Sequence, residues 1–134
     1  MKLRYLLDTN ICIYLMKQAS PTAAVRLAEC YVGEVAISAI TLAELEFGVA
    51  ASGERAQHNR AALDALLTEL AVVPFDGVAA RAYGPVRVQG RARRRDALDK
   101  LIAAQAIASD AVLVTNNSMD FHGYVGLRLE NWTA

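Results

Sequence analysis

The chain has 134 residues, of which 54% are hydrophobic and 21% are charged, and its formal net charge is zero. We expect residues 1–134 to form one domain, because this length supports one hydrophobic core and the composition excludes a disordered chain. No apolar run approaches the ~20 residues of a membrane span, no secretory signal is recognisable, and the two cysteines lack metal-binding spacing, so we expect a cytoplasmic protein that is not in a membrane.

Strands and helices are predicted to alternate along the whole chain. The expected strands cover residues 2–7, 35–38, 71–75, 111–115 and 127–129. The expected helices cover residues 11–17, 20–29, 41–51, 54–70, 77–89 and 96–109, and Asn10 or Thr9 is expected to cap the first of them. This alternation predicts an α/β fold with helices on both faces of a mostly parallel sheet.

Four acids fall where such a fold can gather them: Asp8, Glu44, Asp99 and Asp120. Asp8 ends the first strand, Asp120 follows the fourth, and the other two lie in first turns of helices. The carboxyl ends of parallel strands and the starts of the following helices share one edge of the sheet, so the acids are expected to converge. Clustered carboxylates repel each other unless a cation lies among them, and an oxygen-only set favours Mg²⁺ or Mn²⁺.

Each acid also has an explanation that needs no metal. Thr41 and Glu44 match a capping box, in which the glutamate would bond to the backbone at the helix start. Asp8 could simply cap the first helix. Asp96 could cap the alanine-rich helix, with Asp99 favoured there by the helix dipole, and the fourth acid could be an exposed loop residue. The metal hypothesis therefore rests on all four acids sharing one sheet edge.

Polar residues beside the acids are candidates for a supporting role. Thr115 and Asn117 follow the fourth strand and could hold a water or a ligand, although an asparagine turn after a strand explains them equally well. Thr9 and Asn10 are expected to support Asp8 by capping the helix behind it. Seven of the 14 basic residues lie between Arg81 and Lys100, which is either a solvated surface or a stripe that contacts a polyanion.

Nearly the whole chain resembles the PIN-domain family, specifically the VapC-type toxins of bacterial toxin–antitoxin pairs. The matching stretches are LLDTNICIYL (6–15), ISAITLAELEFGVA (37–50), VVPFDGVAARAYGPVR (72–87), LDKLIAAQAIA (98–108), LVTNNSMDF (113–121) and GLRLENW (126–132). The resemblance implies a three-layer α/β/α sandwich around a sheet of four to five strands. It also implies an endoribonuclease that cleaves RNA phosphodiester bonds with water activated by Mg²⁺ or Mn²⁺.

The resemblance assigns the three best-defined acids of the family to Asp8, Glu44 and Asp99. The fourth acidic position varies and would fall to Asp120, with Asn117 where some relatives carry an aspartate. The arginine run before Asp99 is a departure, because many relatives have a less charged segment with a glycine there. The possible RNA contacts in this run are Arg91, Arg93, Arg94 and Arg95. Asp96 either joins the metal site or caps the helix. Glu46 is expected to point away from the site.

The resemblance further implies partners: an RNA substrate, a small VapB-like antitoxin whose tail crosses the active-site groove, and a second copy of the chain in a homodimer. Residues 11–17 and 41–51 would offer contact surfaces to the antitoxin. Two other functions stay open. A non-catalytic PIN-like module would bind RNA or protein but bind metal poorly, and a phosphoryl-transfer domain would carry a covalent phosphate on Asp8.

Overall fold

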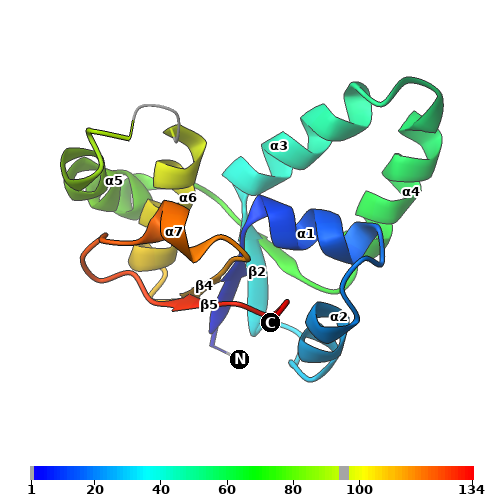
Figure 1. The fold of residues 1–134 in the computed structure, drawn as a ribbon, viewed down its shortest axis with the longest axis horizontal. Helices are drawn as coiled ribbons and strands as arrows, with labels where there is room; N and C mark the ends of the chain where they lie inside the picture. The colour runs from blue at the N-terminus through cyan, green and yellow to red at the C-terminus, as the bar shows by residue number, and fades with distance from the viewer. Residues whose placement is uncertain (1, 94–96) are drawn as a thin grey trace.

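A computed structural model describes residues 2–93 and 97–134 (Figure 1). Its strands are β1 (Tyr5–Leu7), β2 (Val35–Ser38), β3 (Ala71–Val73), β4 (Val112–Val114) and β5 (Leu129–Glu130). They form one five-stranded sheet in the order β3-β2-β1-β4-β5, and every pairing is parallel. The predicted α/β fold with a parallel sheet is confirmed.

Helices cover both faces of this sheet. They are α1 (Thr9–Met16), α2 (Pro21–Ala28), α3 (Ala39–Ala50), α4 (Ala56–Leu67), α5 (Gly77–Gln89), α6 (Ala97–Ala108) and α7 (Ser118–Phe121). Alternate residues of a strand point to opposite faces. Tyr5 and Leu7 therefore join a core with residues of α1 to α4, whereas Leu6 joins a second core with residues of α5, α6 and α7. The central strand β1 is thus buried from both sides.

Helix α6 lies directly on the sheet because small side chains face it. Ala103, Ala104 and Ala106 are fully buried, as expected for an alanine-rich helix that packs closely. Gln105 on the same helix accepts a hydrogen bond from Ser38 at the end of β2, with 3.1 Å between Oγ and Oε1. This contact ties the start of α3 to α6.

Two helix starts differ from the sequence-based expectation. The N-cap of α1 is Asp8, so the expected cap at Asn10 or Thr9 is wrong and the alternative that Asp8 caps this helix is confirmed. The N-cap of α3 is Ser38, whose Oγ accepts a hydrogen bond from the Ile40 N–H at 3.0 Å. Because α3 begins directly after β2, Thr41 lies inside the helix and the capping-box interpretation of Glu44 is wrong. Glu44 lies in the second turn rather than the first.

Other boundaries shift by a few residues. Strand β1 begins at Tyr5 rather than at residue 2, and the expected helix 54–70 divides into a 3₁₀ turn (Gly53–Arg55) and α4. The short helix α7, expected as a loop, contains Asp120. Strand β3 lies at the edge of the sheet and ends directly before Pro74, a residue that strands tolerate at such positions.

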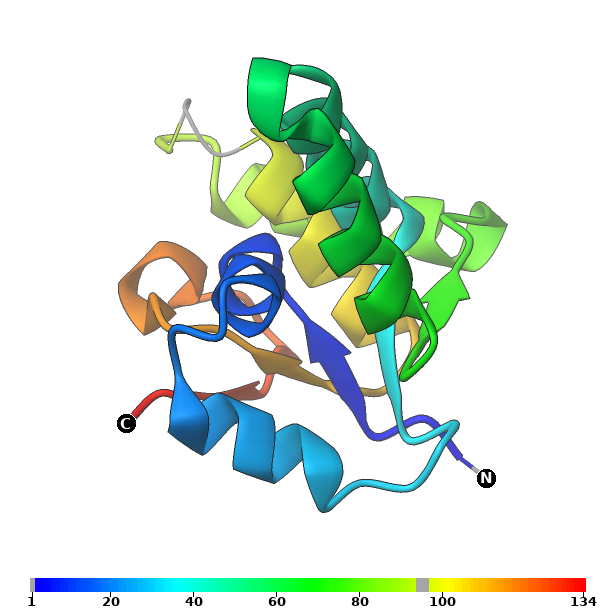
Figure 2. The same ribbon diagram turned by 90° about the vertical axis from the view of Figure 1, so that its right-hand side faces the viewer.

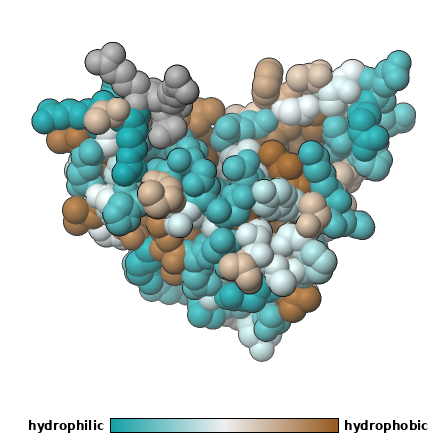
Figure 3. All heavy atoms as spheres, viewed as in Figure 1, coloured by the Kyte–Doolittle hydropathy of each residue, from teal (hydrophilic) through white to brown (hydrophobic). Residues whose placement is uncertain are grey.

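The helices give the molecule two arms. Helices α3 and α4 project together on one side, where they also contact α1 (Figure 2), and α5 and α6 lie on the other side (Figure 1). The space-filling view is hollowed between these two sides (Figure 3). Within residues 2–93 and 97–134, no helix has the length and apolar character to cross a membrane.

Candidate active site

Asp8 lies at the centre of the sheet edge. It follows β1, which pairs with β2 on one side and β4 on the other. The backbone N–H of Asp8 donates to the Val114 carbonyl at 3.0 Å, and its Oδ1 accepts from the Ile11 N–H at 2.9 Å. Only 4% of the residue is exposed. The strand and the helix cap therefore fix the position of this carboxylate.

The surroundings of Asp8 disfavour its negative charge. Burial raises the pKa of the Asp8 carboxyl above its ordinary value, and the charge of Glu44 raises it further. Hydrogen bonds from Thr115, Ile11 and Asn10 lower this pKa in part. A bound cation would stabilise the charged form of a carboxyl that is buried beside a second carboxylate.

Glu44 reaches the same edge from α3. Its Oε1 accepts a hydrogen bond of 2.6 Å from the Thr9 hydroxyl, and the Thr9 and Thr41 hydroxyls lie 3.5 Å apart. Because Thr9 directly follows Asp8, this hydrogen bond holds Glu44 near Asp8. This agrees with a supporting role for Thr9, although the contact is to Glu44 rather than to the helix backbone. Asn10 contributes its backbone N–H to Asp8, and its side chain is exposed.

A chain of hydrogen bonds runs from Asp8 to Asp120. The side chain of Thr115, which is fully buried, bonds to Asp8. Its Oγ1 also accepts from the Asn117 N–H at 3.0 Å, and Asn117 Nδ2 donates to Asp120 Oδ2 at 2.6 Å. Thr115, Asn117 and Asp120 therefore act as one connected unit beside Asp8.

Asp99 lies in the first turn of α6, as predicted, and is half-buried. Asp96, Arg94 and Arg95 lie outside the described residues, so the question of whether Asp96 joins the site is not settled. Among residues 2–93 and 97–134, no three Asp, Glu, His or Cys side chains form a group that could hold a metal ion. The geometry thus pairs Asp8 with Glu44, and a ligand role for Asp99 or Asp120 stays a prediction.

The residues that are brought together fit a hard divalent cation. Carboxylate, hydroxyl and amide oxygens are the donors that Mg²⁺ prefers, and Mg²⁺ is often held by one or two carboxylates, with waters and substrate phosphates completing its coordination. The pair of the buried Asp8 and the half-buried Glu44 meets that requirement. His58 and His122 are both exposed, and neither lies in this set.

The arginines of the basic loop have different surroundings. Arg91 is exposed. Arg93 is half-buried, and its guanidinium donates to the carbonyl oxygens of Asp120 and His122 at 3.1 and 2.5 Å. The expected RNA contact by Arg93 therefore competes with a role inside the protein. Glu46, expected to point away from the site, forms an ion pair with Arg60 on α4.

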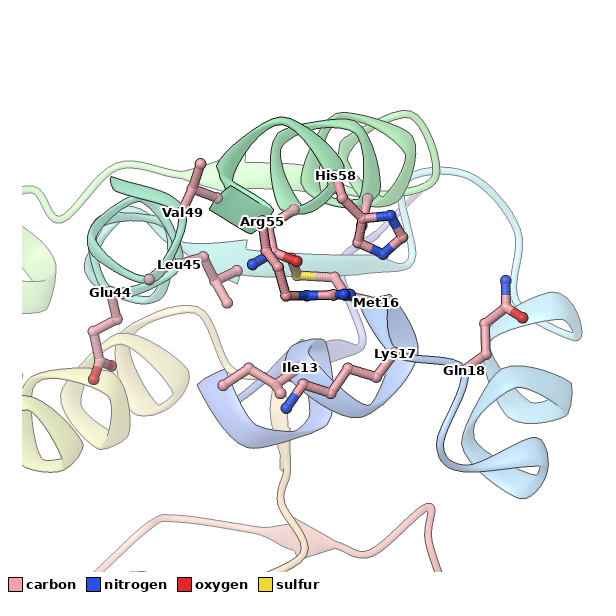
Figure 4. Close-up of a pocket in the computed structure, with 12 residues that line it drawn as sticks. Ile13, Met16, Lys17, Gln18, Glu44, Leu45, Val49, Arg55 and His58 are labelled. Carbon is pink, nitrogen blue, oxygen red and sulfur yellow. The ribbon is translucent and has the colours of Figure 1, made fainter. Parts of the chain in front are cut away.

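A pocket of about 650 Å³ adjoins the site between α1, α3 and α4 (Figure 4). Its apolar lining includes Ile13, Met16 and Leu45, and Arg55 and His58 project into it from the α4 side. Glu44 lies at one end of the pocket (Figure 4). An occupant of the pocket would therefore reach one of the two paired acids.

Comparisons with known proteins identify proteins to which this chain is similar. The PIN domain family matches residues 5–124. Ribonuclease VapC2 of Rickettsia felis is 37% identical over 134 residues, which cover 96% of this chain and 97% of that protein. The tRNA(fMet)-specific endonuclease VapC of Shigella flexneri is 32% identical over 133 residues, with 98% and 99% covered. The fold is also similar to the crystal structure of VapBC2 from Rickettsia felis bound to a promoter DNA fragment, with a TM-score of 0.85, 36% identity, and 97% of this chain and 99% of that chain covered.

Proposed function

The chain belongs to the PIN-domain family and, within it, to the VapC ribonucleases, and on this premise we propose that Asp8 and Glu44 hold a divalent cation at which RNA is cleaved. The observation that carries the proposal is the pair itself: Asp8 is buried, burial and the charge of the half-buried Glu44 raise the pKa of Asp8, and the Thr9 hydroxyl donates to Glu44. The cation is Mg²⁺ or Mn²⁺, since the donor set is oxygen alone.

Each residue has a distinct task in this proposal. Asp8 is fixed by its helix cap and provides the central carboxylate, and Glu44 is oriented by the Thr9 hydroxyl. Asp99 and Asp120 contribute further negative charge from α6 and α7, and Asn117 orients Asp120. When bound, the cation supplies activation of water and stabilisation of charge on the scissile phosphate. None of these tasks requires a covalent bond between the enzyme and the RNA.

The substrate is RNA, and we propose transfer RNA as the first class to test, because relatives from Shigella flexneri and Salmonella typhimurium are named tRNA(fMet)-specific endonucleases. The assay compares cleavage of initiator tRNA and an elongator tRNA by the purified protein, with Mg²⁺ and with a chelator. Mapping the new 5′ ends identifies the cleaved bond. Equal cleavage of both tRNAs would contradict specificity for the initiator without affecting the metal site.

Variants test the assigned residues in the same assay. We expect Asp8→Asn and Glu44→Gln to lose cleavage by at least ~100-fold, because each removes a charged ligand of the cation. Glu46→Gln is the matched control: it removes a carboxylate from the same helix, but one that pairs with Arg60. Undiminished cleavage by Asp8→Asn and Glu44→Gln would refute the assignment. A wild type that cleaves no RNA would instead favour a binding module.

The pocket between α1, α3 and α4 is the proposed seat of a VapB-like antitoxin segment. It is lined by both helices that the sequence suggested as contact surfaces, and an occupant could extend to Glu44. Met16→Glu places a charge in this pocket and should weaken antitoxin binding, whereas Val25→Glu, on an exposed position of α2, should not. Equal affinities of the two variants, measured by calorimetry, would contradict this placement.

Two further properties belong to the proposal. We expect a homodimer, as is typical of the family, and sedimentation of the purified chain at several concentrations tests it. We also place the protein in the cytoplasm, where its RNA substrate is found. Fractionation of cells that express the protein tests this location.

A further inference from the structure

We propose that Arg93 is a positioning residue that fixes α7, and with it Asp120, against the rest of the site. The inference rests on the proposed metal site and names a residue that acts on it from outside. Arg93 lies in the loop between α5 and α6, far in sequence from the residues that it holds. Its guanidinium donates to the Asp120 carbonyl at 3.1 Å and to the His122 carbonyl at 2.5 Å.

Helix α7 needs such an anchor because it has only four residues. One helical turn is unstable by itself, and the carbonyl groups at its C-terminal end lack partners within the helix. Arg93 supplies two N–H donors and a positive charge at that end, where the helix dipole favours a cation. The N-terminal end is held separately, through Asn117 and Thr115. Together the two anchors fix both ends of the segment that carries Asp120.

Arg93 is itself held in place. Its guanidinium stacks 5.2 Å from the ring centre of Tyr124, and its own carbonyl accepts a hydrogen bond from the buried ammonium of Lys100. Gly90 lets the loop approach Tyr124 closely, since a Cβ there would lie 2.4 Å from the Tyr124 hydroxyl oxygen. Lys100 directly follows Asp99 on α6, so this cluster connects α6, which carries Asp99, with α7, which carries Asp120.

An alternative is that Arg93 contacts RNA, as its place in the basic loop suggests, and the two roles predict different measurements. We expect Arg93→Gln to weaken Mn²⁺ binding about 10-fold in the absence of RNA, at the low end of the range for residues that orient ligands. It should lower kcat while the KM for RNA stays within about 2-fold. A phosphate contact would instead raise KM and reduce its salt dependence by about 0.7 to 0.9 in log–log slope, with Mn²⁺ affinity unchanged.

The experiment measures Mn²⁺ affinity by calorimetry and hydrogen exchange of residues 117–124 without metal. Arg93→Gln should weaken Mn²⁺ binding and speed the hydrogen exchange of residues 117–124. Arg128→Gln is the matched control. Arg128 also donates to a backbone carbonyl, that of Asp110 at 2.9 Å, but at the amino ends of the strands, away from the site at their carboxyl ends. Arg93→Lys, which can reach one carbonyl with a single ammonium, should be intermediate, and it gives the same comparison if Arg93→Gln does not fold.

A double variant shows whether Arg93 acts through Asp120. In the Asp120→Asn background, Arg93→Gln should change Mn²⁺ affinity by less than about 2-fold, because coupled residues are not additive. An undiminished effect there, an equal effect of Arg128→Gln, or unchanged exchange of residues 117–124 would each overturn the positioning role. A wild type that binds no Mn²⁺ would refute the proposed metal site instead. The exchange measurement would still test whether Arg93 fixes residues 117–124.

Discussion

Thr115→Val tests how strongly the site depends on one buried hydroxyl. The substitution preserves shape but removes the donor to Asp8 and the acceptor of the Asn117 N–H. A hydrogen bond to a charged group contributes about 1.5–3 kcal/mol and a neutral one about 1 kcal/mol, so we expect a loss of about 2.5–4 kcal/mol in the free energy of unfolding. With 134 residues, the entropy of unfolding is about 0.28 kcal/mol per kelvin, and Tm should fall by about 9–14 °C.

The same variant should also weaken the metal site. Without the Thr115 hydroxyl, the pKa of Asp8 rises further and Asn117 loses its anchor, so Mn²⁺ affinity should fall about 10- to 100-fold. Thr115→Ser keeps the hydroxyl and should retain the affinity, while Thr68→Val removes an exposed hydroxyl at the end of α4 and serves as the control. Calorimetry and thermal denaturation measure both effects. If Thr115→Val bound Mn²⁺ as tightly as the wild type, the hydrogen-bond chain would have no part in the site.

Three other predictions concern the fold, the charge of Asp8 and the identity of the glutamate. Gly90→Ala should lower Tm by about 4–11 °C, because its Cβ would overlap Tyr124 at a cost of about 1–3 kcal/mol; an unchanged Tm would contradict this contact. In metal-free buffer, the raised pKa of Asp8 means that the folded state holds this proton more tightly than the unfolded chain, so stability falls as pH rises through the folded-state pKa. Asp8→Asn, which keeps the N-cap, should therefore be more thermostable than the wild type at about pH 7, and the difference should vanish below about pH 4. A variant less stable than the wild type at neutral pH would contradict a raised pKa of Asp8. Glu46→Gln should retain full RNA cleavage, and a loss equal to that of Glu44→Gln would mean that the wrong glutamate has been assigned.

The sequence located Asp8 because local rules decide its place. An apolar strand followed by Asp-Thr-Asn puts an acid at the end of a buried strand whatever the rest of the chain does, and the structure has Asp8 there with 4% exposure. The alternation of strands and helices likewise predicted the parallel sheet, because each of the first three strands is followed by helical segments long enough to cross the sheet.

Competing local signals explain where the sequence misled. Thr41 and Glu44 fit a capping box, but Ser38, the last residue of β2, also caps the helix. The helix therefore starts earlier and Glu44 faces Thr9. The contacts of Arg93 depend on how residues 90–93 pack on residues 120–124, which no periodicity in the sequence reports. The same holds for α7, whose four residues are too few to produce a helical pattern.

Titration of the purified protein with Mn²⁺ by calorimetry, comparing the wild type with Asp8→Asn, tests the metal site most directly. The paired carboxylates of Asp8 and Glu44 predict saturable binding by the wild type and an affinity at least about 10-fold weaker for the variant. Identical binding curves for the two proteins, or a wild type that binds no Mn²⁺, would contradict a cation held by Asp8.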